Sequence, residues 1–254
     1  MGPPAHIDLW YTILGDVDEG LLPRYRALLG AQESARLERF HFARDRRRDL
    51  ITRALARTVL SRYAAVAAGA WVFSPDANGR PRIVSPCPGR PLEFNISHSG
   101  EMVALAVAAR PVGVDVECLS RDSDIERLER YFSPTEREAL LALAPDDRRR
   151  RFFELWTLKE SYLKARGVGL RLPLDAFTFE FPGEHGLRLS FEPRLTDSAR
   201  RWRFWQLAPR ADHVVSLCAE RGEPEPSLTV HEVVPLERAG LIEARVSRSS
   251  ALEP

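Results

Sequence analysis

Residues 110–117 read Arg-Pro-Val-Gly-Val-Asp-Val-Glu, and from Val112 onward a valine stands at every second position. A period of two is typical of a half-buried strand, so we expect the valines to face a core. Asp115 and Glu117 then share the opposite face, with their Cβ atoms about 7 Å apart, twice the rise per strand residue. Gly113 leaves that face open just before the two acids, where a ligand can approach.

Two carboxylates at this spacing can converge on one hard cation, whose oxygen ligands lie about 2.0–2.6 Å away. The alternative is an ordinary acidic strand face in water, which is common in antiparallel sheets. The stretch alone favours the ordinary face, so the choice depends on the rest of the chain.

The composition is that of a folded domain or a pair of small ones. The chain has 254 residues, of which 44% are hydrophobic and 29% charged. Basic and acidic residues number 37 and 36, and a net charge of +1 argues against general nucleic-acid binding. Three cysteines without C-x-x-C spacing fit a reducing compartment and no zinc site. We see no signal peptide and no apolar run of about 18 residues, so we expect a cytoplasmic protein without a membrane span.

The first half of the chain combines helix and strand patterns. We expect a strand over 6–14, a helical segment over 31–68, and strands over 92–99 and 102–109. The helical segment is rich in arginine. Most of these arginines are expected to be solvated, although a few can grip a polyanion, because guanidinium matches phosphate oxygens in a bidentate way. Its early turns hold Arg36, Arg39, Arg44, Arg47 and Arg48.

The second half begins with helices and ends in strands. Ser133, Pro134 and Glu136 form a predicted capping box at a helix start, and a longer helix is expected over 145–166. Apolar or alternating stretches then predict further strands. These stretches are 177–181, 187–191, 202–207 and 213–219, with a possible edge strand over 228–234. Residues 244–254 are expected to be disordered.

On the long helix, Trp156, Glu160 and Lys164 form one line at i, i+4 and i+8. An acid and an amine one turn apart can be a surface ion pair that contributes a few tenths of a kcal/mol. They can also be a polar row at the edge of a cleft. Gly167 is placed to end the helix.

Three blocks now coincide in order and spacing. They are Phe94-Asn95-Ile96-Ser97-His98-Ser99-Gly100, Gly113-Val114-Asp115-Val116-Glu117, and Trp156-Thr157-Leu158-Lys159-Glu160-Ser161-Tyr162-Leu163-Lys164 followed by Gly167-Val168-Gly169-Leu170. Together they resemble the 4′-phosphopantetheinyl transferases, specifically the larger, monomeric type that activates surfactin synthetase. Asn78-Gly79-Arg80-Pro81 resembles the Gly-Lys-Pro element of that family, with arginine in place of lysine.

The resemblance implies an α+β fold of two similar halves about a pseudo-two-fold axis, each a small antiparallel sheet packed with a long helix. We expect an N-terminal half over 1–112 that contacts the nucleotide, a C-terminal half over 113–235 with the metal and the catalytic helix, and a tail over 236–254. The implied reaction moves the phosphopantetheine arm of coenzyme A onto a serine of an acyl or peptidyl carrier protein. It requires Mg²⁺ and releases adenosine 3′,5′-bisphosphate.

The resemblance also implies roles for single residues. Asp115, Glu117 and Glu160 would hold Mg²⁺, which neutralises the pyrophosphate. Glu160 would be the base toward the carrier serine, a metal ligand, or both, and Lys164 would stabilise charge on the phosphate. The other expected phosphate and nucleotide contacts are Ser97, His98, Arg80 and, among the early arginines, Arg48 as the best guess over Arg36, Arg39 and Arg44. Lys159 points elsewhere or joins the site, and Trp156 packs behind Glu160.

The carrier protein is expected to dock near residues 120–140, where Arg121, Arg127 and Arg130 would suit an acidic helix. Tyr131 and Phe132 would add apolar contact, or the segment is simply a solvated helix with a buried phenylalanine. Two rival functions remain for the same residues: a Mg²⁺-dependent phosphohydrolase acting on a nucleotide or coenzyme A pyrophosphate, and a non-catalytic coenzyme-binding module.

Overall fold

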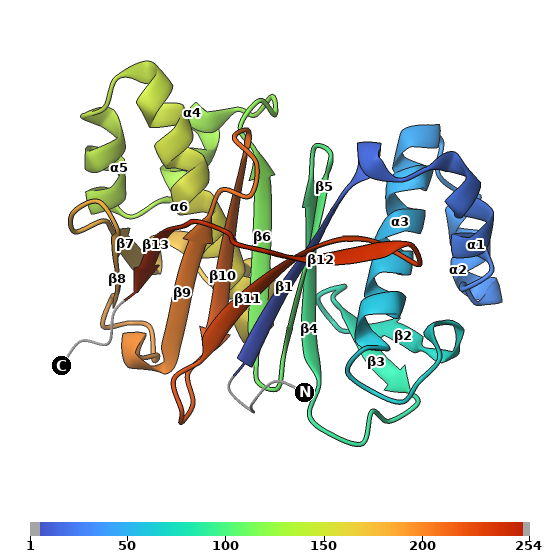
Figure 1. Cartoon of the computed structure of the whole chain (residues 1–254). Helices are drawn as coiled ribbons and strands as arrows, with labels where there is room; N and C mark the ends of the chain where they lie inside the picture. Colours follow the sequence, from blue (N-terminus) through green and yellow to red (C-terminus); the bar gives the residue numbers. More distant parts are fainter. Residues whose placement is uncertain (1–5, 251–254) are drawn as a thin grey trace.

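A computed structural model describes residues 6–250 as two sheets that lie face to face between two long helices (Figure 1). The layers follow one another as helix α6, second sheet, first sheet and helix α3. The prediction of an α+β fold with two halves, each pairing a sheet with a long helix, is confirmed.

The first sheet has five strands in the order β12-β11-β1-β5-β4. Their bounds are β1 His6–Ile13, β4 Glu93–Ser99, β5 Met102–Ala108, β11 Ser227–Val234 and β12 Arg238–Ile242. The second sheet has six strands in the order β6-β10-β9-β13-β8-β7. Their bounds are β6 Val112–Cys118, β7 Phe177–Glu180, β8 Gly186–Phe191, β9 Trp202–Leu207, β10 His213–Glu220 and β13 Val246–Ser250. A small hairpin joins β2 Val72–Pro75 to β3 Pro81–Ser85.

Six α-helices complete the described part of the chain. They are α1 Leu22–Arg26, α2 Ala31–Leu37, α3 Ala43–Leu60, α4 Ile125–Leu128, α5 Pro134–Leu141 and α6 Pro145–Arg166. The single helical segment expected over 31–68 is therefore two helices with a break between them. The capping box of α5 is confirmed, because Ser133 Oγ accepts from Glu136 N and the Glu136 carboxylate accepts from Ser133 N. None of these helices is long and apolar enough to cross a membrane.

The C-terminal part of the chain corrects the expected boundaries. Strand β11 lies in the first sheet, parallel to β1, instead of belonging to a C-terminal half over 113–235. The expected tail contains β12 and β13, so residues 244–250 are ordered as strand, while 251–254 lie outside the described residues. The sheets are mixed, because β13 also runs parallel to β8. Alternation predicts a strand over 228–234 but cannot tell which open sheet edge will pair with it.

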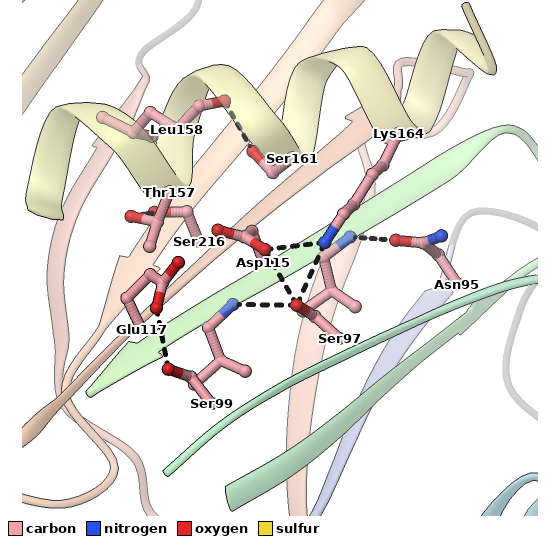
Figure 2. Close-up of polar contacts among 12 residues, drawn as sticks. Asn95, Ser97, Ser99, Asp115, Glu117, Thr157, Leu158, Ser161, Lys164 and Ser216 are labelled. Atoms are coloured by element: carbon pink, nitrogen blue, oxygen red, sulfur yellow. Dashed lines mark hydrogen bonds and ion pairs between the residues drawn. The ribbon is translucent and has the colours of Figure 1, made fainter. Parts of the chain in front are cut away.

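The valine face of β6 packs where the sequence places it. Val112, Val114 and Val116 are at most 1% exposed and share a core between the two sheets with Leu9 and Trp205. The acidic face of β6 consequently points the other way, toward α6 (Figure 2). This orientation places both carboxylates between a strand and a helix.

Gly113 determines how closely α6 approaches that strand. A Cβ atom at this position would lie 2.0 Å from Ser161 O and 2.4 Å from Ala165 N, both of which are backbone atoms of α6. The expectation that Gly113 leaves an open face for a ligand is therefore wrong, because the helix fills that space. The close contact brings the last turns of α6 over β6. Gly167, with a φ of 67°, then ends the helix in the left-handed conformation.

Candidate active site

The candidate site lies where β4 and β6, the facing edges of the two sheets, meet the last turns of α6 (Figure 2). Asp115 and Glu117 are each 5% exposed. Glu160 and Lys164 stand one turn apart on α6, and both line a cavity of about 300 Å³. The structure thus brings together the four residues that the sequence singles out on β6 and α6.

Asp115 is held by an amine and a hydroxyl. Lys164 Nζ donates to Asp115 Oδ1 at 2.6 Å and to Ser97 Oγ at 3.0 Å, and Ser97 Oγ lies 2.8 Å from the same Asp115 oxygen. The second oxygen, Asp115 Oδ2, is buried without a hydrogen-bond partner. Such an oxygen is costly unless a cation or donor meets it.

Glu117 is held from both sides of β6. Ser99 Oγ donates to Glu117 Oε2 at 2.7 Å, and Arg121 donates to both carboxylate oxygens at 2.7 and 2.8 Å. Burial raises the pKa of Glu117, and the neighbouring charge of Asp115 raises it further. The two β6 acids are therefore close enough to repel each other.

Glu160 is the third acid of the group. Burial is the largest cause that raises its pKa, to about 7, and the charges of Asp115 and Glu117 add to it against the opposing effect of Lys164. The charge of Asp115 raises the pKa of both Glu117 and Glu160, so a cation beside these acids would stabilise their ionised forms. Their oxygen chemistry and the unpartnered Asp115 Oδ2 fit a hard divalent ion such as Mg²⁺.

A different set of potential ligands lies nearby and does not fit a metal. Among the described residues, ligand atoms of Cys118, Asp212 and His213 lie within 4.8 Å of one another. Both ring nitrogens of His213 are already engaged, Nδ1 with Asp212 Oδ1 at 2.8 Å and Nε2 with the Ser99 carbonyl at 3.2 Å. This cluster therefore fixes the end of β4 and leaves no free histidine nitrogen for an ion.

Arg80 is held by the backbone at the junction of the two halves. Its guanidinium donates to three backbone carbonyls: Lys164 O at 2.7 Å, Phe94 O at 2.7 Å and Val112 O at 3.2 Å. Arg80 thus joins the end of α6 to the starts of β4 and β6. It also lines the smaller cavity, and its contact with the nucleotide stays a prediction.

A larger cavity, of about 620 Å³, adjoins the site on the side of the first sheet. Arg36, Arg39 and His98 are on its wall, and Gly79, Pro81 and Ile96 line both cavities. Partial burial, followed by the charge of Arg48, lowers the pKa of His98, which favours the neutral ring.

Arg48, the preferred arginine in the sequence, does not line this cavity and pairs with Asp45 at 2.9 Å. The break between α2 and α3 decides which arginines face the pocket. Helix α2 folds back against α3, so that Arg36 and Arg39 reach the wall.

Lys159 points away from the site. Its ammonium pairs with Glu136 Oε2 at 2.8 Å and donates to the carbonyls of Leu174 and Phe177, all in the interior of the second half. Trp156 packs against Phe152 and Phe132 at the partly exposed edge of the same core. Both side chains therefore contribute to the packing of α6 against the core of the second half.

Sequence reasoning missed two residues at the site. Asn95 Oδ1 accepts from Val114 N at 2.8 Å, and Ser99 Oγ accepts from Cys118 N at 3.1 Å. Polar residues do alternate along 93–99, which indicates that one face of this strand is polar. The role of that face depends on which strand lies opposite β4, and the alternation does not show this.

The segment expected to meet a carrier is only partly suited to it. Tyr131 is 54% exposed, whereas Phe132 is 2% exposed and packs in the core beside Phe152, which confirms the alternative of a buried phenylalanine. Arg121 is engaged with Glu117.

Two family models match the chain in succession. One describes the N-terminal part of a 4′-phosphopantetheinyl transferase and covers residues 22–110; the other describes the 4′-phosphopantetheinyl transferase superfamily and covers residues 111–218. The chain therefore belongs to the 4′-phosphopantetheinyl transferase superfamily.

Its relatives place the chain in the Sfp-type subgroup. It is 36% identical over 156 residues to the 4′-phosphopantetheinyl transferase Sfp of Bacillus subtilis, covering 61% of this chain and 67% of that protein. It is 37% identical over 166 residues to the 4′-phosphopantetheinyl transferase HetI of Nostoc, covering 65% and 70%. A solved Thermotoga maritima holo-[acyl-carrier-protein] synthase is similar with a TM-score of 0.35 and 19% identity, over 45% of this chain and 70% of that one.

Proposed function

We propose that this chain moves the 4′-phosphopantetheine arm of coenzyme A onto a serine of an apo carrier protein and releases adenosine 3′,5′-bisphosphate. The observation that carries the proposal is the group formed by Asp115, Glu117, Glu160 and Lys164 beside a cavity that continues into an arginine-lined pocket. Membership of the transferase family supplies the reaction class, and the site supplies the residues.

The two connected cavities suit the two ends of coenzyme A. Arg36 and Arg39 would meet the phosphate-bearing nucleotide in the larger cavity, because guanidinium pairs well with phosphate oxygens. His98 lies on the same wall and would hydrogen-bond a phosphate oxygen. The pyrophosphate would then pass Gly79 and Ile96 into the smaller cavity beside Lys164.

Asp115, Glu117 and Glu160 would hold Mg²⁺. When bound, the ion neutralises pyrophosphate charge and makes the departing nucleotide a better leaving group. The Lys164 ammonium lies 2.6 Å from Asp115 Oδ1 and balances the charge of that carboxylate. Lys164 also lines the smaller cavity, where its ammonium would face the phosphate that is transferred and would stabilise the developing charge.

Glu160 is the group best suited to take the proton of the carrier serine. It borders the cavity into which the carrier serine would reach, so it could act as base as well as metal ligand. Asp115 is tied to Lys164 and Ser97, and Glu117 to Ser99 and Arg121, so these two acids are fixed ligands.

The carrier would approach over α4 and the turn that follows it, where Arg127, Arg130 and Tyr131 are exposed. An acidic carrier helix suits this surface, since each arginine can pair with a carboxylate. We propose a monomeric enzyme of the cytoplasm, which agrees with three cysteines that are all free.

The test is intact-mass spectrometry of an apo carrier protein after incubation with the chain, coenzyme A and Mg²⁺. We expect a gain of one phosphopantetheinyl group, which is lost with EDTA and with Glu160→Ala, a variant that should stay folded. Coenzyme A cleaved without any gain by several carrier types would favour the phosphohydrolase. Binding of coenzyme A without cleavage would favour a binding module.

A further inference from the structure

The junction between the halves is closed by side chains instead of a backbone ladder. Strand β4 ends the first sheet and β6 ends the second, so in the described part of the chain no strand pairing joins them. An edge strand carries N–H groups that need partners when they are buried. Those of β6 find them in three residues of β4: Asn95, Ser97 and Ser99. Figure 2 shows the contacts to Asn95 and Ser97.

These contacts repeat with a period of two on both strands. Val114 N donates to Asn95 Oδ1 at 2.8 Å, Val116 N to Ser97 Oγ at 3.4 Å, and Cys118 N to Ser99 Oγ at 3.1 Å. Each acceptor lies 19 residues before its donor. We call these three residues the β4 ladder. It sets the register of β6 against β4, because a shift by one residue would turn all three side chains away.

The two serines of the β4 ladder also hold the acids. Ser97 Oγ lies 2.8 Å from Asp115 Oδ1, and Ser99 Oγ lies 2.7 Å from Glu117 Oε2. A hydroxyl has one donor and two acceptor positions, so each serine can accept from the β6 backbone and donate to the carboxylate of the preceding residue. The carboxylate is thereby fixed relative to the strand that carries it.

Ser99 is itself held more firmly than a surface hydroxyl. It is 6% exposed, and its carbonyl oxygen lies 3.2 Å from His213 Nε2 on β10. Asp212 engages the other nitrogen of that ring. By contrast, the second partner of Glu117, Arg121, has a side chain that is 54% exposed. The rigid side of the Glu117 carboxylate is therefore the Ser99 side.

We propose that Ser99 is a positioning residue for the transfer reaction, which aims the Glu117 carboxylate at the divalent cation. This inference rests on the proposed magnesium site. It assigns Ser99 no contact with coenzyme A or the carrier. Outer partners of metal ligands commonly change metal affinity by about 10–100-fold when they are removed.

The test compares Ser99→Ala with Ser99→Thr and with Asn95→Ala. Asn95 is the matched control, because it makes the same kind of contact to the β6 backbone and holds no carboxylate. Binding of Mn²⁺ to the free protein is measured directly, together with thermal unfolding and the Mg²⁺ dependence of transfer. We expect Ser99→Ala to weaken Mn²⁺ binding and raise the half-saturating Mg²⁺ concentration by about 10-fold. Ser99→Thr should restore most of both.

Asn95→Ala should lower the unfolding temperature as much as Ser99→Ala and leave Mn²⁺ affinity at the wild-type value. The inference is overturned if both alanine variants lose stability alike and neither changes Mn²⁺ binding, because the β4 ladder would then be structural only. It is also overturned if the wild-type protein binds no Mn²⁺. A failed transfer assay alone would instead count against the proposed reaction, since metal binding needs no carrier.

Discussion

Helix α6 carries two lysines that each pair with a carboxylate, and their surroundings differ in every other respect. Lys159 has a fully buried side chain, and its three N–H groups meet Glu136 and the carbonyls of Leu174 and Phe177. Lys164 has a side chain that is 27% exposed, meets Asp115 and Ser97, and borders a cavity. The first ammonium is saturated by the fold, whereas the second lies where a ligand can reach it.

The difference shows what separates a structural ion pair from a functional one. Burial lowers the pKa of Lys159, and the charge and hydrogen bond of Glu136 oppose that effect. Glu136 also accepts from the backbone of Ser133 and Phe179, which makes the pair a joint between α5, α6 and β7. The Lys164 pair lies beside an unpartnered oxygen, Asp115 Oδ2, and two further acids. The second pair is therefore the one that lies beside the proposed cation site.

Breaking the buried pair should have the largest effect. Lys159→Met keeps much of the side-chain volume and leaves Glu136 as an uncompensated buried charge, which costs about 3–5 kcal/mol of unfolding free energy. Urea unfolding measures this loss, and transfer by the folded fraction at low temperature should remain close to wild type. A variant with normal stability but lost transfer would place Lys159 in the site.

Breaking the exposed pair should act on the rate instead. Lys164→Ala removes a positive charge from the phosphate region, and we expect the turnover rate to fall by about 10²–10³-fold. Its stability should fall by less than that of Lys159→Met, because the Lys164 side chain reaches solvent although Asp115 is buried. Steady-state transfer at saturating coenzyme A and carrier provides the measurement.

Lys164→Arg is the matched variant, since it keeps the charge with a different geometry. It should recover part of the turnover rate. A change in the KM for coenzyme A with turnover unaffected would show that Lys164 only binds the substrate.

Sequence patterns predict the two elements that bear the site better than they predict the site itself. Alternating valines establish which face of β6 is acidic, and the i, i+4 line on α6 places Glu160 and Lys164 together. Both are local periodicities. Whether Lys159 or Lys164 joins the acids follows from the approach of α6 at Gly113, which local periodicity does not describe.

The features that sequence reasoning missed all depend on distant segments. Strand β11 pairs with β1 across more than two hundred residues, for example His6 with Ser227. Arg80 donates to carbonyls from three other elements, and Ser99 gains its partner only because β4 faces β6. Arg36 and Arg39 are separated from Arg48 by a helix break whose angle the sequence does not reveal.

A substitution that shifts α6 tests whether the position of the helix separates the roles of the two lysines. Gly113→Ala places a methyl group against two backbone atoms of α6 near Lys164, and overpacking of this kind costs about 1–3 kcal/mol. Compared at equal folded fraction, we expect transfer to fall further than in Lys159→Met, because the shift occurs in the turn that holds Lys164. Gly240→Ala is the control, since a Cβ there meets nothing within 4 Å. Equal transfer by Gly113→Ala and Lys159→Met at matched folded fraction would contradict the assigned geometry.

The smallest expected effect comes from the acid beside the exposed pair. Burial raises the pKa of Glu160 from 4.5 to about 7, so the metal-free folded state binds its proton more tightly than the unfolded state. This contribution to stability is fully present below pH 4.5 and is lost as the pH rises through 7. The shift corresponds to about 3 kcal/mol at most, and solvent at the cavity reduces it, so we expect on the order of 1–2 kcal/mol.

Urea unfolding in EDTA between pH 5 and 8 measures that loss, and Glu160→Gln isolates it, because the other titrating groups are common to both proteins. The wild-type protein should become less stable relative to Glu160→Gln as the pH rises. Saturating Mg²⁺ should remove the difference, since a bound cation stabilises the carboxylate form. A stability difference that does not change with pH would show that Glu160 is already ionised at pH 5. In that case the three acids would not repel one another, and the argument that they await a cation would lose its electrostatic support.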